Sequence, residues 1–220
     1  MKLKGLIIDM DGTLTKFNLD YMAARRRALD EIEKRGLRTL EMNDQVSLFI
    51  LLNHLRMRLE PAEFMKLRST LYKFFEEMEV KAAQDVVLYP GAAETLRELR
   101  SRSLKLGLVT NNSRAGTDIT LERLSLRTIF DAVVTRDDCD EMKPASAPIL
   151  KILAELGISP EAAIMVGDGV LDMQAARAAG VRCVAVTTGP FPIERVLKAE
   201  PDYLLGSIND LPILIGQLEA

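Results

Sequence analysis

The stretch GLIIDMDGTLT, residues 5–15, decides the fold, because an apolar run ends there abruptly in two closely spaced acids, Asp9 and Asp11. The apolar residues of segment 3–8 are typical of a short buried strand. Two carboxylates at the end of such a strand repel each other. The fold must therefore place something beside them that compensates for their charge.

The composition indicates a globular chain with a substantial core. Its 220 residues are 48% hydrophobic, which suits one domain, or one domain with a modest insertion. The net charge of −3 and the lack of Trp argue against a nucleic acid or an anionic membrane as the main partner.

The expected location is the cytoplasm. No apolar run approaches the roughly 18 residues of a membrane span, and Asp9 interrupts the N-terminal run before a signal-peptide core forms. The two cysteines, Cys139 and Cys183, form no disulfide framework, which is typical of a reducing compartment. We therefore expect a soluble cytoplasmic protein.

The apolar pattern is helical from about residue 16 to residue 84, with apolar side chains at every third or fourth position. The second and third helices of this block should begin at Asp44 and Pro61. After the sequence Tyr89-Pro90-Gly91, helices and strands alternate. We expect strands at 104–110, 131–135, 163–167, 182–187 and 203–205, and helices at 92–103, 114–125, 146–156, 171–179 and the C-terminus. This alternation predicts an α/β fold with right-handed crossovers and a parallel sheet, which the first strand joins.

Polar side chains follow the predicted strands, and the carboxyl ends of parallel strands meet at one edge of a sheet. The residues at these ends are Asp9, Asp11, Thr110, Asn111, Asp168 and Asp172, with Lys143 ahead of the next helix. Several carboxylates in one crevice raise each other's pKa or need a cation, and hard oxygen ligands suit Mg²⁺. The only histidine, His54, lies in the helical block, which argues against zinc and against a Ser-His-Asp triad.

The neighbours of these acids suit a phosphate group. Thr110 offers a hydroxyl and Lys143 a compact positive charge. Gly12 and Thr13 lie where the chain leaves the first strand, so we expect their backbone amides to point into the crevice and cradle an anion. A carboxylate, a cation, a lysine, a hydroxyl and free amides together indicate phosphoryl transfer.

In such a site Asp9 would be the nucleophile that forms an aspartyl-phosphate. Asp11 would be the general acid for the leaving oxygen and then the base for water. Taken singly, Asp168 and Asp172 could equally cap the helix that follows them. Their shared order and strand-end positions favour the catalytic interpretation.

Four motifs resemble those of the haloacid dehalogenase superfamily, and they cover nearly the whole chain, from residue 3 to about 190. Residues 9–14 (DMDGTL) are similar to its DxDGT motif, Thr110-Asn111 to its second motif, Lys143-Pro144 to its third and residues 167–172 (GDGVLD) to its fourth.

The resemblance implies a Rossmann-like three-layer core with a parallel sheet, formed by residues 1–15 and 88–220, plus an inserted α-helical cap at 16–87. It also implies Mg²⁺ held by Asp9, the backbone carbonyl of Asp11 and Asp168, with Asp172 in support. The residues implied to hold the phosphate are Thr110, Asn111 and Lys143, next to Gly12.

The resemblance favours an Mg²⁺-dependent phosphatase that acts on a small phosphorylated metabolite. Phosphoglycolate is the substrate it suggests, while sugar phosphates and nucleotides stay open because the cap matches no substrate-defining pattern. A phosphomutase shares all the core motifs, and a receiver-like phospho-acceptor domain is the non-enzymatic alternative. Asp11 disfavours a dehalogenase, which is similar but lacks that acid. The sequence predicts no oligomeric state.

Overall fold

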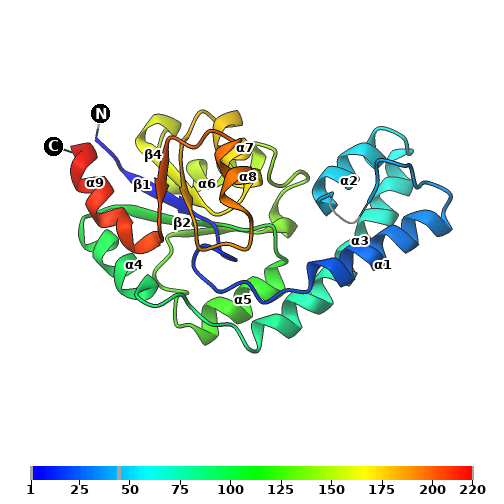
Figure 1. Ribbon diagram of the computed structural model, residues 1–220, viewed down its shortest axis with the longest axis horizontal. Coiled ribbons are helices and arrows are strands. Elements are labelled where there is room, and N and C mark those ends of the chain that lie inside the picture. Colours follow the sequence, from blue (N-terminus) through cyan, green and yellow to red (C-terminus); the bar gives the residue numbers. More distant parts are fainter. Residues whose placement is uncertain (1, 44–45, 220) are drawn as a thin grey trace.

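The centre of the molecule is a six-stranded parallel sheet with the order β3-β2-β1-β4-β5-β6 (Figure 1). The computed structural model describes residues 2–43 and 46–219. The strands are β1 (Gly5–Ile8), β2 (Lys105–Val109), β3 (Ala132–Val134), β4 (Ala163–Gly167), β5 (Arg182–Val186) and β6 (Tyr203–Leu205). β1 pairs with β2 on one side and β4 on the other, and all its residues are buried. Whatever follows β1 therefore lies at the middle of the carboxyl edge of the sheet.

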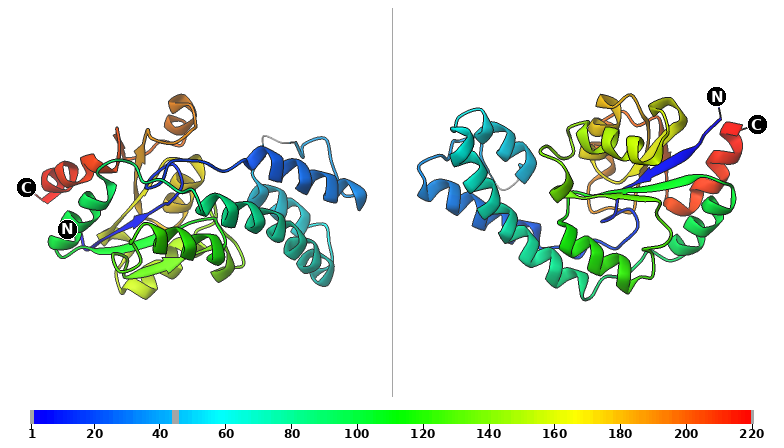
Figure 2. Two further views of the ribbon diagram at one scale, coloured as in Figure 1. Left: turned by 90° about the horizontal axis from the view of Figure 1, so that it is seen from below. Right: turned by 180° about the vertical axis from the view of Figure 1, so that it is seen from behind.

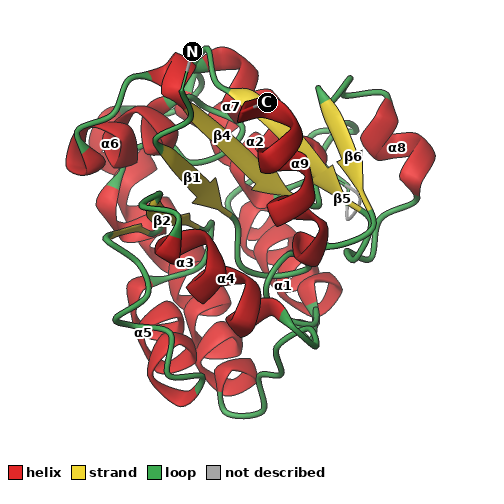
Figure 3. Cartoon of the chain, turned by 90° about the vertical axis from the view of Figure 1, so that its left-hand side faces the viewer, coloured by secondary structure: helices red, strands yellow, loops and turns green. Residues whose placement is uncertain are grey.

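Helices cover both faces of the sheet, which gives three layers (Figure 3). One face packs against α4 (Ala92–Ser101), α5 (Arg114–Arg123) and α9 (Leu211–Glu219). The other face packs against α6 (Ala147–Leu156), α7 (Val170–Ala178) and α8 (Ile193–Leu197). Burial on both faces explains why the central strands are almost purely apolar.

The remaining helices form a helical region, residues 21–83, that is inserted between β1 and β2 and extends away from the sheet (Figures 1 and 2). Its helices are α1 (Tyr21–Lys34), α2 (Leu48–Arg56) and α3 (Pro61–Ala83). Their buried apolar side chains form a cluster of their own, separate from the two clusters that flank the sheet. The long helix α3 returns to the sheet and packs against α5.

The α/β fold predicted from the sequence is confirmed, and so is a helix that begins at Pro61. Asp44, the expected start of the second helix, lies outside the described residues. The described helix α2 begins at Leu48, and the Ser47 side chain caps it by accepting a hydrogen bond from the amide of Phe49 (3.4 Å).

Two features of the chain differ from the expectations. The helix expected at 92–103 ends at Ser101, because Ser103 adopts a left-handed backbone (φ 64°) that turns the chain into β2. Helix α8 has five residues, too few to give a periodic pattern, and was not predicted.

Within the described residues, no helix combines the length and the apolarity needed to cross a membrane.

Candidate active site

Lys143 is the buried cation at the carboxyl edge of the sheet. Its ammonium group donates hydrogen bonds to Asp9 Oδ1 (2.6 Å), Asp172 Oδ1 (2.6 Å) and the carbonyl of Val109 (3.0 Å). Burial lowers the pKa of Lys143, but Asp172 and Asp9 outweigh this effect and raise the pKa above its usual value. Lys143 therefore stays protonated and ties the end of β1 to the first turn of α7.

Three buried carboxylates surround this cation. Oxygens of Asp9, Asp168 and Asp172 lie within 4.8 Å of one another. Burial raises the pKa of Asp9 to about 7, against the lowering effect of Lys143. Burial, together with the charges of Asp9 and Asp172, raises the pKa of Asp168 well above its usual value. One lysine does not balance three carboxylates, so this cluster favours the binding of a further cation.

The Asp168 carboxylate keeps one oxygen, the buried Oδ2, without a hydrogen-bond partner. A side chain at Gly12 or Gly189 would collide with this oxygen. An added Cβ would lie 2.4 Å from it at Gly12 and 1.8 Å from it at Gly189. These two glycines thus let the backbone close around Asp168. The carboxylate oxygens of Asp9, Asp168 and Asp172 are hard ligands, which fit a divalent metal ion.

Gly189 was not identified from the sequence. It follows β5, at another strand end of the same edge, and the Gly-Pro pair that it forms with Pro190 is a turn signal. The adjacent Thr188 donates a hydrogen bond from Oγ1 to the carbonyl of Gly12 (2.6 Å). The loop after β5 is therefore joined directly to the turn after β1.

The turn after β1 differs from the expectation in one respect. The amide of Gly12 donates to the carbonyl of Thr15 (2.8 Å), and the amide of Thr13 donates to the carbonyl of Met10 (3.3 Å). The expectation that these amides point into the crevice is wrong, because the turn folds back on itself and uses them. Gly12 instead contributes its positive φ of 86° and its lack of a side chain beside Asp168.

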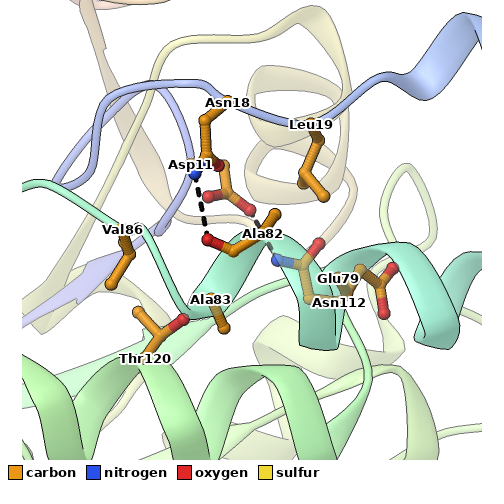
Figure 4. Close-up of a pocket in the computed structure, with 9 residues that line it drawn as sticks. All are labelled: Asp11, Asn18, Leu19, Glu79, Ala82, Ala83, Val86, Asn112 and Thr120. Atoms are coloured by element: carbon orange, nitrogen blue, oxygen red, sulfur yellow. Dashed lines mark hydrogen bonds between the residues drawn. The ribbon is translucent and has the colours of Figure 1, made fainter.

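Asp11 is held by two side chains beside a small pocket (Figure 4). Thr15 Oγ1 donates to Asp11 Oδ1 (3.0 Å), and Asn112 Nδ2 donates to Asp11 Oδ2 (2.5 Å). Burial raises the pKa of Asp11, and the hydrogen bonds from Asn112 and Thr15 oppose that effect. Asn112 Oδ1 in turn accepts a hydrogen bond from the hydroxyl of Tyr21, the first residue of α1 (3.2 Å).

The segment after β2 reaches both the lysine and Asp11. Asn111 Nδ2 donates to the carbonyl of Lys143 (3.0 Å). Thr110 is buried, and its Oγ1 accepts the amide of Asn112 (3.2 Å), so this hydroxyl shapes the segment itself. The structure thus joins Asp9, Lys143, Asp168 and Asp172 in one cluster, with Asp11 and Asn111 beside it.

A second buried ion pair fastens the helical region to this segment. Arg136, which follows β3, donates from Nη1 and Nη2 to the two carboxylate oxygens of Glu79 on α3 (2.6 and 2.9 Å). Glu79 Oε2 also accepts the amide of Ser113, and Arg136 Nη1 donates to the carbonyl of Asn111 (2.9 and 3.1 Å). Figure 4 shows Glu79 next to Asn112. The sequence did not indicate this pair, because no local pattern links positions 57 residues apart.

The chain resembles known proteins in sequence. The model of the family described as haloacid dehalogenase-like hydrolase matches residues 6–186. A phosphoglycolate phosphatase of Salmonella typhimurium is 37% identical over 147 residues, which are 66% of this chain and 58% of the relative. A phosphoglycolate phosphatase of Escherichia coli K12 is 36% identical over the same shares of the two chains. The match thus spans less than two thirds of the length of these relatives.

Solved structures share the fold. A hydrolase from Pseudomonas syringae superposes with a TM-score of 0.72 at 21% identity, covering 98% of this chain and 99% of that one. A phosphonoacetaldehyde hydrolase-like protein from Oleispira antarctica has a TM-score of 0.72 at 17% identity, with coverage of 99% and 93%. At these identities the likeness shows a common fold that includes the inserted helices.

Proposed function

The chain belongs to the haloacid dehalogenase-like hydrolase family, and on this premise we propose that it is an Mg²⁺-dependent phosphatase acting on a small phosphomonoester. The observation that carries the proposal is the cluster in which Lys143 donates to both Asp9 and Asp172, while Asp168 lies alongside with a buried oxygen that lacks a partner. This arrangement provides a nucleophile, a fixed positive charge and spare oxygen ligands at one point.

Asp9 is the proposed nucleophile. Lys143 holds Asp9 Oδ1 and so orients the carboxylate. Asp9 Oδ2, which accepts a hydrogen bond from the Thr13 hydroxyl (3.4 Å), is the oxygen proposed to attack phosphorus. The bond from phosphorus to the ester oxygen breaks as the bond from Asp9 to phosphorus forms. Lys143, Asn111 and Thr110 are the proposed phosphate-binding residues. Gly12 lets the turn after β1 approach Asp168, because a Cβ at this position would lie 2.4 Å from Asp168 Oδ2.

Asp11 is the proposed general acid and base. It gives its proton to the departing ester oxygen, and the alcohol leaves neutral. The Asp11 carboxylate then takes a proton from the water that attacks the phosphorus of the aspartyl-phosphate. The bond from phosphorus to Asp9 breaks, which releases phosphate and regenerates the Asp9 carboxylate. Burial raises the pKa of Asp11, which favours the protonated acid that the first step needs.

The proposed Mg²⁺ ligands are the side chains of Asp9 and Asp168 and the backbone carbonyl of Asp11, with Asp172 in support. When bound, the ion supplies positive charge that neutralises the phosphoryl oxygens and the crowded carboxylates. The acid cluster and the unpartnered oxygen of Asp168 support this assignment.

We propose that residues 16–87 act as a cap over a core formed by residues 1–15 and 88–220. The separate apolar cluster of the helical region and its position at the carboxyl edge of the sheet support this division. Motion of such a cap would admit the substrate and exclude water from the first step. Phosphoglycolate, which the names of the curated relatives suggest, is the first substrate to test.

The test is phosphate release from phosphoglycolate and para-nitrophenyl phosphate with Mg²⁺. Asp9→Asn should lower kcat about a thousand-fold or more, and Asp11→Asn about a hundred-fold or more. Asp30→Asn, at an exposed position of α1, is the matched control and should turn over like wild type. If no phosphate ester releases phosphate, the proposal fails. Isomerisation of a sugar phosphate without phosphate release would instead favour the phosphomutase.

A further inference from the structure

The reacting carboxyl of Asp11 is connected to the helical region through one intermediate side chain. Asn112 Nδ2 donates to Asp11 Oδ2 (2.5 Å), and Tyr21 donates its hydroxyl proton to Asn112 Oδ1 (3.2 Å). Asn112 lies in the segment after β2 and Tyr21 at the start of α1, 91 residues apart in sequence. The chain of contacts therefore crosses from the helical region to the sheet edge.

The orientation of the Asn112 side chain is fixed at both ends. The nitrogen of the amide faces Asp11 and donates to Oδ2. The oxygen of the amide then faces Tyr21, whose hydroxyl can donate to it. The backbone of Asn112 is fixed as well, because its amide donates to Thr110 Oγ1 and its carbonyl accepts the amide of Arg136 (3.2 and 2.9 Å). Asn112 is buried, so this orientation is protected from water.

Tyr21 is itself held firmly. Its ring stacks on Phe17 with centroids 5.2 Å apart and lies 6.3 Å from the ring of Phe75 on α3. Asp20 caps the helix that begins at Tyr21 by accepting the amide of Ala23 (3.0 Å). The hydroxyl is thereby aimed at Asn112 by the packing of the helical region.

The charged groups near Asp11 are engaged elsewhere. Lys143 donates to Asp9 and Asp172, and Glu79 accepts from Arg136 and from the amide of Ser113. Both Glu79 and Lys143 act on Asp11 through their charge, in opposite directions. The direction in which the Asp11 carboxyl points therefore depends on the hydrogen bonds that Asn112 and Thr15 donate to it.

We propose that Asn112 and Tyr21 are positioning residues for Asp11, which hold its carboxyl where it can protonate the leaving oxygen. This inference rests on the proposed function. It makes proton donation depend on how the helical region sits on the core, because Tyr21 moves with α1. Neither residue is among the proposed phosphate-binding residues, so the binding of phosphate itself should be unaffected.

The test compares two esters with different leaving groups. Para-nitrophenolate leaves without a proton, whereas the alkoxide of phosphoglycolate needs one, and kcat/KM reports the first chemical step for each ester. Asn112→Ala should lower kcat/KM for phosphoglycolate about ten-fold or more, and Tyr21→Phe by a smaller factor, while the value for para-nitrophenyl phosphate stays within two-fold. Tyr203→Phe, which removes a hydroxyl from β6, is the control and should keep the wild-type ratio of the two values.

Equal losses of kcat/KM on the two esters would overturn the proposal, because a general structural defect slows both reactions alike. No loss on either ester would overturn it as well. Crystal structures of wild type and Asn112→Ala give a readout that does not need activity, and Tyr21→Phe serves if Asn112→Ala fails to fold. We expect the Asp11 carboxyl to rotate in the variant, and an unchanged carboxyl would contradict the proposal. If wild type shows no Asp9-dependent phosphate release, the proposed function fails separately, and the crystal structures alone decide the positioning of Asp11.

Discussion

Two buried charge clusters lie at the carboxyl edge of the sheet, and they are built in opposite ways. In the pair of Glu79 and Arg136, both carboxylate oxygens and both terminal guanidinium nitrogens are hydrogen-bonded. The cluster of Asp9, Asp168 and Asp172 has three acids around one lysine, and Asp168 Oδ2 has no partner. The first cluster is balanced and the second is not.

The difference indicates what each cluster does. A buried pair of opposite charges fixes the relative position of two elements, here α3 and the segment after β2. Arg136 Nε is buried without a hydrogen-bond partner, so the pair is balanced in charge rather than in every hydrogen bond. A cluster that keeps surplus negative charge away from water lowers stability, and such clusters are found where a cation or a substrate supplies the missing charge. The first cluster should therefore govern folding, and the second should govern metal binding and turnover.

The largest expected effect comes from breaking the balanced pair. Glu79→Ala leaves the Arg136 charge buried without its partner, and should lower the free energy of unfolding by about 3–5 kcal/mol. Urea denaturation in EDTA measures this loss, with Asp30→Asn as an exposed-acid control that should change little. A loss below about 1 kcal/mol, the value of an exposed ion pair, would show that the pair does not fasten the helical region.

Filling the unbalanced cluster should have a smaller stabilising effect. Mg²⁺ at a hundred times its dissociation constant should raise the free energy of unfolding by about 2.7 kcal/mol, because only the folded chain brings the acids together. Thermal unfolding with and without Mg²⁺ measures the gain. Asp168→Asn should remove it and Glu79→Gln should retain it; a gain that survives in Asp168→Asn would place the ion elsewhere.

The pH dependence of metal-free stability should follow from Asp9. Its pKa rises from 3.8 to about 7 on folding, so the folded chain binds more protons than the unfolded chain between these values. The stability that Asp9 contributes is therefore present at acid pH and is lost as the pH rises toward and through about 7. In EDTA, Asp9→Asn should gain stability relative to wild type from pH 5 to pH 8. A difference that stays constant over this window would contradict the raised pKa.

The smallest effect should come from Asp168→Asn without metal. The change removes a carboxyl whose charged form is disfavoured by burial and by Asp9 and Asp172, and whose Oδ2 has no partner. The free energy of unfolding should therefore stay the same or rise by up to about 1 kcal/mol. The contrast with Glu79→Ala is informative, because both changes remove one buried carboxylate. Urea denaturation of the two variants in EDTA compares them directly, and similar losses would remove the distinction between the clusters.

The sequence predicted the parts that are encoded locally. Asp9 and Asp168 were assigned to one edge because each ends an apolar run, and the alternation of helices and strands predicted that those strands are parallel. The amides of Gly12 and Thr13 were assigned wrongly, because a turn's internal hydrogen bonds depend on how it closes.

The sequence pattern did not predict the contacts between the helical region and the core. Tyr21 meets Asn112, and Glu79 meets Arg136, across 91 and 57 residues. In sequence Tyr21 and Glu79 lie on amphipathic helices, where an aromatic or acidic residue is common. Only the packing of α1 and α3 against the sheet edge brings them to their partners.

The proposed chemistry depends most directly on covalent participation of Asp9. Rapid acid quenching of the enzyme during turnover of a ³²P-labelled phosphomonoester, followed by trypsin digestion, would locate the label. We predict label on the peptide of residues 5–16, which contains Asp9, in wild type and none in Asp9→Asn. Undiminished phosphate release by Asp9→Asn, with no label on that peptide in either protein, would contradict the account.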